Sequence, residues 1–156
     1  MTLPTTPSQT VGPFYSIGLC RRADNAPGDD VELIGSVYDG GGEPIGDAVV
    51  EVWDPVGRQW ARSGTDGEGT FSFRLSKPRG DGDDAPRLDA YVFARGLLKH
   101  QLTRIYFPDE QANASDPVLS ALSEDERATL VATPEDGRFR FDIRMQGDGA
   151  TVFFGF

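Results

Sequence analysis

The stretch that decides the fold is "VELIGSVYDGGGEPIGDAVVEVWD", residues 31–54. Its first eight residues alternate, with Val31, Leu33 and Val37 separated by more polar partners, as expected of a half-buried strand. The cluster "DGGGEP" that follows is rich in residues that turns prefer. A second apolar run, "AVVEVWD", begins at Ala48. The two runs are predicted to be strands paired as a hairpin.

Short alternating runs recur along the rest of the chain, and 19 glycines and 11 prolines separate them. Further strands are expected at 71–75, 85–96, 99–107 and 138–145. This pattern is typical of an all-β sandwich rather than of a helical or parallel α/β chain. One or two short helices are expected, because Asp116-Pro117 and the Ser123-x-x-Glu126 pattern are helix-start signals.

The strand at 85–96, "APRLDAYVFARG", places three charges on its larger face. Because successive side chains of a strand point to opposite faces, the small apolar residues share the other face. The larger face holds Arg87, Asp89, Tyr91, Phe93 and Arg95. Three charges on a strand that is otherwise apolar indicate something other than a plain core strand.

Composition narrows the class of protein. The 156 residues fit one domain, and the net charge of −10 argues against nucleic acid or an anionic membrane as partner. Cys20 is the single cysteine, which favours a reducing, cytoplasmic location. No apolar run approaches the roughly 18 residues that span a bilayer, and the first residues lack the pattern of a signal peptide.

Residue counts exclude several reaction classes. His100 is the single histidine, so the chain cannot supply a site that needs two imidazoles. No G-x-S-x-G elbow accompanies it, and phosphate-binding glycine loops are absent from the sequence. On residue chemistry alone, the chain is a β-sandwich without an evident catalytic centre.

An uncharged segment near the start, "TTPSQTVGPFY" at 5–15, is stiffened by two prolines. Val11, Phe14, Tyr15 and Ile17 lie in it or just after it and need an apolar surface to pack on. The segment is therefore predicted to be an ordered arm that packs on the body of the protein or on a partner.

Four segments together carry a family resemblance: "TPSQTVGPF", "GSVYDGGGEPIGDAVVEVW", "FARGLLKHQLTRIYF" and "FRFDIRMQGDGATVFF". They resemble the alpha subunits of the intradiol ring-cleaving dioxygenases. The hairpin segment alone is generic, since it also resembles transthyretin-like modules. The resemblance implies a single β-sandwich domain over 1–156, of the transthyretin (prealbumin)-like type, with 1–17 as an N-terminal arm on the partner subunit.

The resemblance also implies where a metal would be. In the family, a catalytic beta subunit holds Fe(3+) with two tyrosines and two histidines. The matching positions here are Gln59 or Trp60, then Phe71, Arg87 and Asp89. The resemblance therefore implies no metal on this chain, with iron on the beta subunit and with Arg87 and Asp89 able to form an ion pair in the vacated site.

The family's catalytic pocket lies between the two subunits, and the resemblance implies that this chain contributes to it without supplying a catalytic residue. The implied substrates are protocatechuate and O2, cleaved to 3-carboxy-cis,cis-muconate in the β-ketoadipate pathway of aromatic catabolism. The chain is expected to be inactive alone. The implied substrate-pocket residues are Thr10, Gly12, Pro13, Phe14 and Arg95.

Other interpretations of Arg95 and of the whole chain stay open at this point. Arg95 could form a surface or interface salt bridge without touching substrate. The whole chain could be a stand-alone transthyretin-like binding module, which would leave the arm without a role. A catalytic intradiol enzyme in its own right is disfavoured by the missing iron ligands.

Overall fold

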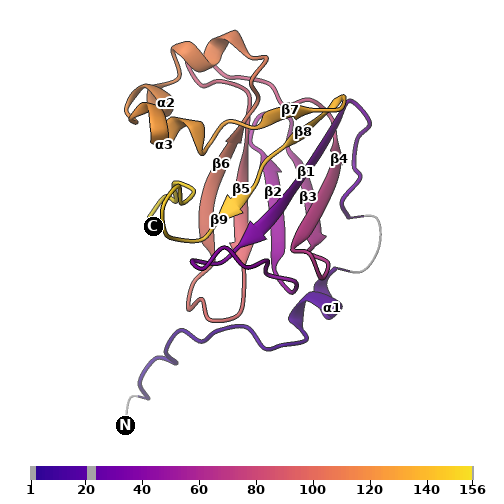
Figure 1. The fold of residues 1–156 in the computed structure, drawn as a ribbon, viewed down its shortest axis with the longest axis vertical. Helices are drawn as coiled ribbons and strands as arrows, with labels where there is room; N and C mark the ends of the chain where they lie inside the picture. Colours follow the sequence, from indigo (N-terminus) through magenta and orange to yellow (C-terminus); the bar gives the residue numbers. More distant parts are fainter. Residues whose placement is uncertain (1–2, 21–23, 156) are drawn as a thin grey trace.

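Two β-sheets packed face to face make up the body of the protein (Figure 1). The computed structural model describes residues 3–20 and 24–155. The strand order is β4-β1-β8-β7 in the first sheet, where β9 also pairs with β1, and β3-β2-β5-β6 in the second. The predicted all-β sandwich is confirmed. The strands are β1 (Val31–Tyr38), β2 (Val49–Asp54), β3 (Gln59–Gly64), β4 (Thr70–Leu75), β5 (Arg87–Phe93), β6 (Gln101–Tyr106), β7 (Thr133–Glu135), β8 (Arg138–Arg140) and β9 (Ile143–Arg144).

The first two strands lie in different sheets, so the predicted hairpin of 31–38 with 48–54 is wrong. β1 pairs with β4, whereas β2 pairs with β3 and β5. The turn between them is present, and the carboxylate of Asp39 accepts hydrogen bonds from two of its backbone N–H groups. The chain nevertheless crosses from one sheet to the other. Leu33 of β1 and Val50 of β2 are both fully buried, because strands in opposite sheets can bury their apolar faces against each other.

The core lies between the sheets and follows the predicted alternation. Phe71 of β4 and Leu88 and Val92 of β5 are buried in one hydrophobic cluster. Every second residue of β5 is only half buried and faces outward. This alternation places Arg87 and Asp89 on the outer face of the second sheet.

Of the short helices in the described part of the chain, two begin where the sequence predicts. Asp116 caps α2 by accepting hydrogen bonds from two backbone N–H groups, and Ser123 caps α3 in a capping box with Glu126. The other two have no side-chain cap and gave no sequence signal. Among the described residues, no helix has the length and apolarity to cross a membrane. The helices are α1 (Tyr15–Leu19), the 3-10 helix η1 (Gln111–Ala114), α2 (Pro117–Ser120) and α3 (Glu124–Ala128).

The run at 138–145 forms two short strands, β8 and β9, rather than the single predicted strand. Both pair with β1 in parallel, with Phe139 opposite Leu33 in β8. Between them, Asp142 Oδ1 accepts a hydrogen bond from the backbone N–H of Ser36 at 3.0 Å. A side chain thus replaces a bond of the ladder and interrupts the strand, while Ile143 of β9 is fully buried.

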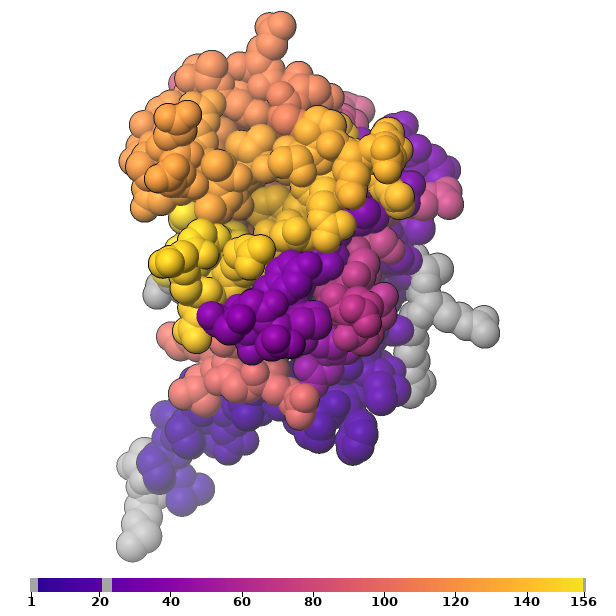
Figure 2. Space-filling view, in the orientation of Figure 1, coloured from indigo at the N-terminus to yellow at the C-terminus, as the bar shows by residue number. Residues whose placement is uncertain are grey.

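The N-terminal arm, residues 3–14, projects from the lower end of the body in Figures 1 and 2. α1 follows it and lies against the second sheet. The hydroxyl of Tyr15 donates to the carbonyl of Phe93 at 2.6 Å. The sulfur of Cys20 lies so close to Gly64 that a Cβ added there would be 3.1 Å from it.

Candidate functional site

Arg87 and Asp89 lie side by side on the outer face of β5, where they form an ion pair. Arg87 Nε lies 3.4 Å from Asp89 Oδ1, and Arg87 Nη1 donates to Asp84 Oδ2 at 3.0 Å. Arg104, opposite Asp89 on β6, brings its Nε within 3.6 Å of the same carboxylate oxygen. The spacing along β5 predicted that Arg87 and Asp89 share a face, but it gave no signal for Asp84 or Arg104.

Hydrogen bonds of the Tyr106 hydroxyl connect these ion pairs to the buried Asp116. Arg104 Nη1 donates to the Tyr106 hydroxyl at 3.3 Å, and that hydroxyl donates to Asp116 Oδ1 at 3.2 Å. Burial raises the pKa of Tyr106, which keeps the phenol protonated as a donor. Asp116 is also the cap of α2. The charge network, which joins β5, β6 and α2, consists of Asp84, Arg87, Asp89, Arg104, Tyr106 and Asp116.

The side chains at the implied ligand positions do not fit ferric iron. Burial lowers the pKa of Arg87, but Asp89 and Asp84 outweigh that effect and raise it, so the guanidinium stays charged and offers no lone pair. The carboxylate of Asp89 lies between two guanidinium groups. The indole of Trp60 donates hydrogen bonds but has no lone pair for a metal. The side-chain oxygen of Gln59, Oε1, already accepts a hydrogen bond from the backbone N–H of Ser76. Among the described residues, no group of three or more His, Cys, Asp or Glu could hold a metal ion.

The four implied ligand positions do not all meet. Trp60 lies opposite Trp53 of β2, which in turn lies opposite Asp89, so Trp60, Asp89 and Arg87 share the outer face of the second sheet. Phe71 belongs to the first sheet and is buried between the sheets. The structure therefore brings three of these positions to one face and leaves Phe71 in the core.

One predicted pocket residue of the arm, Thr10, contacts the turn that carries Arg95. The backbone N–H of Gly96 donates to Thr10 Oγ1 at 2.7 Å, which fixes the arm next to the turn that follows β5. The carbonyl of Gly12 accepts the N–H of Tyr15 at 3.3 Å where the arm turns into α1. Burial also raises the pKa of Tyr15, so its hydroxyl remains a donor to β5. Thr10 thus lies against the turn that carries Arg95, and Gly12, Pro13 and Phe14 follow it along the chain. These five residues are called the arm end below.

Arg95 is held by one carboxylate and is otherwise open. Its Nε contacts Asp47 Oδ2, the one ion pair of Arg95 among the described residues. The side chain is 58% exposed, whereas that of Arg87 is 11% exposed. The surface salt bridge considered for Arg95 is therefore present, and it leaves the guanidinium accessible.

A hollow of about 270 Å³ separates the arm from the connection between β5 and β6. The ring of His100 lies in it, with its centroid 5.3 Å from that of Phe93 and 5.6 Å from that of Tyr91. Its volume is below that of most small-molecule sites. The lining residues are Gln9, Val11, Phe93, Ala94, Leu97, Leu98, Lys99 and His100.

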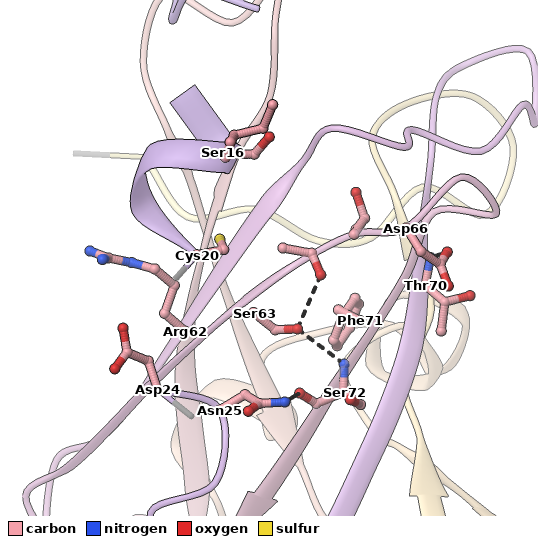
Figure 3. A pocket seen from close by; sticks show the side chains of 13 residues that line it. Ser16, Cys20, Asp24, Asn25, Arg62, Ser63, Asp66, Thr70, Phe71 and Ser72 are labelled. Carbon is pink, nitrogen blue, oxygen red and sulfur yellow. Dashed lines mark hydrogen bonds between the residues drawn. The ribbon is translucent and has the colours of Figure 1, made fainter. Parts of the chain in front are cut away.

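A larger hollow of about 510 Å³ lies between α1 and the neighbouring strands β3 and β4 (Figure 3). Ser63 Oγ donates to the carbonyl of Gly64 and accepts the N–H of Ser72, whose carbonyl accepts from Asn25. Burial raises the pKa of the Cys20 thiol, so the hollow offers hydrogen bonding rather than nucleophilic chemistry. Sequence reasoning missed this set, because it comes from separate segments without a shared motif. The lining residues are Ser16, Ile17, Cys20, Asp24, Asn25, Arg62, Ser63, Gly64, Thr65, Asp66, Thr70, Phe71 and Ser72.

The chain is similar to curated proteins along nearly its whole length. The protocatechuate 3,4-dioxygenase alpha chain of Burkholderia cepacia is 40% identical, with 98% of each chain covered. The alpha chain of Pseudomonas putida is 36% identical, over 99% of this chain and 98% of the relative. The beta chain of Burkholderia cepacia is 28% identical, over 80% of this chain and 67% of the relative.

Solved structures agree on the fold. The dioxygenase domain from Streptomyces sp. SirexAA-E gives a TM-score of 0.61 at 16% identity, covering 91% of this chain and 99% of that one. An intradiol ring-cleavage dioxygenase from Tetranychus urticae gives 0.61 at 13% identity, covering 90% and 93%. No protein-family profile matches the chain. On the strength of its curated relatives, the chain belongs to the family of protocatechuate 3,4-dioxygenase alpha chains.

Proposed function

We propose that this chain is the non-metallated alpha subunit of a hetero-oligomeric protocatechuate 3,4-dioxygenase. A beta subunit holds the ferric iron, and the complex cleaves protocatechuate with O2 to 3-carboxy-cis,cis-muconate. The observation that carries the proposal is a contrast within the chain: the donors of the charge network do not fit iron, while the arm end is open to a partner. The single cysteine is consistent with a cytoplasmic complex.

The arm supplies the contact with the beta subunit. We assign residues 1–17, which include the arm and the first residues of α1, to the contact with the partner, and residues 1–156 to one domain. Phe14 and Ile17 are 74% and 70% exposed. Burying an apolar side chain of this size stabilises a complex by roughly 2 kcal/mol, so the two side chains favour association.

The glycine at position 12 is consistent with a substrate or partner lying close to the backbone of the arm. A Cβ added to Gly12 would meet nothing within 4 Å, and its φ is not positive. Nothing among the described residues therefore requires a glycine there. A substrate or partner backbone that lies against Gly12 and Pro13 gives the residue a role, because only glycine lets another group lie directly on the backbone.

Arg95 supplies positive charge for the substrate. Protocatechuate carries a carboxylate, and a guanidinium binds a carboxylate through two parallel hydrogen bonds. The exposure of Arg95 keeps its terminal nitrogens accessible at the surface where the arm meets the body. Arg95 thus orients the ring without acting as an acid, a base or a ligand.

The test is to produce the chain alone and together with a beta chain, and to measure iron content and protocatechuate-dependent O2 uptake. We expect iron and turnover in the complex and neither in the isolated chain. Deleting residues 1–14, or changing Arg95→Ala, should lower activity without lowering iron content. Arg138→Ala is a matched control, since Arg138 pairs with Glu32 on the first sheet, away from the arm.

Two results would overturn the proposal. One is stoichiometric iron with turnover in the isolated chain. The other is a stable chain that forms no complex with the beta chain, which would support the stand-alone binding module instead.

A further inference from the structure

An exposed arginine binds a small anion well only if its side chain is already oriented. Arg95 has many rotamers, and fixing them on a ligand costs conformational entropy. Its contact with Asp47 reduces that freedom before any substrate arrives. The role of Asp47 developed here rests on the proposed function of Arg95.

Asp47 is presented by a loop that is fastened on both sides. Thr65 Oγ1 accepts the N–H of Ala48 at 2.9 Å and donates to the carbonyl of Ile45 at 2.6 Å. The N–H of Thr65 donates to the carbonyl of Ala48 at 2.9 Å. The residues before and after Asp47 are therefore tied to one threonine, and the Asp47 side chain is only 23% exposed. The backbone position from which the Asp47 carboxylate extends is therefore held in place.

The turn that carries Arg95 is equally constrained. The carbonyl of Phe93 accepts the Tyr15 hydroxyl at 2.6 Å, and the N–H of Gly96 donates to Thr10 at 2.7 Å. Gly96 has a φ of +91°, which favours glycine and gives the turn its shape. The ion pair between Asp47 and Arg95 consequently joins two loops that are each held by hydrogen bonds.

We propose that Asp47 is a positioning residue for the substrate carboxylate. It contacts the Nε side of the Arg95 guanidinium, and a guanidinium has five donors arranged around a plane. Donors on the terminal nitrogens remain for the carboxylate of protocatechuate. Asp47 acts through Arg95 and does not touch the substrate.

The experiment is steady-state kinetics of the alpha–beta complex carrying Asp47→Asn, with protocatechuate and with catechol, which lacks the carboxylate. We expect KM for protocatechuate to rise about tenfold, because Arg95 loses the charged partner that orients it, with kcat changed less than about twofold. The kinetics with catechol should not change. Asp47→Glu should restore part of the affinity, since it keeps the carboxylate. Asp29→Asn is the matched control, because Asp29 also forms an exposed ion pair with an arginine, Arg74.

The double variant Asp47→Asn with Arg95→Ala separates the possible failures. We expect it to match Arg95→Ala alone, because Asp47 acts only through Arg95. If Arg95→Ala leaves KM unchanged, the proposed function of Arg95 fails and this inference fails with it. If Arg95→Ala raises KM while Asp47→Asn does not, or if both substrates lose activity equally in Asp47→Asn, only the positioning role is wrong.

Discussion

Arg87 and Arg95 lie near opposite ends of β5, and the sequence pattern places them on one face. Arg87 is nearly buried between two carboxylates, within a network that also includes a second guanidinium and a buried phenol. Arg95 is mostly exposed, has one carboxylate partner and lies beside the arm. The comparison teaches that burial and the number of partners separate a structural arginine from one free to bind a ligand.

The strongest test of this difference is Arg87→Ala. Removing one member of a largely buried ion-pair network leaves the other charges unpaired, so we expect a loss of about 3 kcal/mol in the free energy of unfolding. Activity per assembled complex should change little. The thermal unfolding midpoint and the KM for protocatechuate measure the two effects. A variant that melts like the wild type but binds substrate poorly would reverse the roles of the two arginines.

Arg95→Lys should produce the opposite pattern with a smaller effect. Lysine keeps the charge but loses the planar fork, so we expect KM for protocatechuate to rise about tenfold, which is about 1.4 kcal/mol. The unfolding midpoint should stay within experimental error of the wild type, because exposed ion pairs contribute little to stability. A large fall in that midpoint would place Arg95 in the same class as Arg87.

Tyr106→Phe removes one hydroxyl from the charge network. We expect a loss of about 1 kcal/mol in the free energy of unfolding, because Asp116 keeps its backbone donors. Because the pKa of Tyr106 is raised, its contribution to the free energy of unfolding depends on pH. A group whose pKa is raised by folding contributes stability that is present below its unfolded pKa, near 10 for tyrosine, and lost as the pH rises above it.

Unfolding measured from pH 8 to pH 11 should therefore show a decline on the alkaline side that is shallower in Tyr106→Phe. Tyr15 has a raised pKa as well, so part of the decline should remain in that variant. An unchanged alkaline slope would remove Tyr106 from the titrating groups.

Gly64→Ala should have the smallest effect. The added Cβ would lie 3.1 Å from Cys20 Sγ, so the end of α1 must shift by a few tenths of an ångström. We expect a change of about 0.5 kcal/mol, visible as a roughly twofold faster reaction of Cys20 with a thiol reagent. Gly67→Ala is the control, since a Cβ there meets nothing within 4 Å. Equal rates in both variants would show that α1 does not depend on this close approach.

Local patterns predicted the elements of the fold better than their pairing. Alternation identified which residues of β5 share a face, and the caps at Asp116 and Ser123 identified two helix starts. The turn after β1 reverses the chain whether the next strand joins the same sheet or the opposite one. Since β1 pairs instead with strands distant in sequence, no local signal distinguishes the two outcomes.

The candidate site shows the same limit. The resemblance indicated Thr10 and Arg95 as parts of one site, and the hydrogen bond from Gly96 to Thr10 joins segments 86 residues apart. The spacing of Arg87 and Asp89 predicted a shared face, but Arg104 and Asp47 became visible only through strand register and loop packing. Phe71 has the spacing of a core residue, and its burial agrees with that spacing rather than with a place beside Arg87.

The parallel pairing of β1 with β8 has a consequence for biosynthesis. Leu33 lies opposite Phe139, so one edge of the first strand stays without its partner until most of the chain has left the ribosome. Contacts between such distant residues slow folding, and an open strand edge can pair with another chain. Nascent chains that stall before β8 would therefore be the forms most prone to aggregate, and early binding by a chaperone would raise the yield of folded protein.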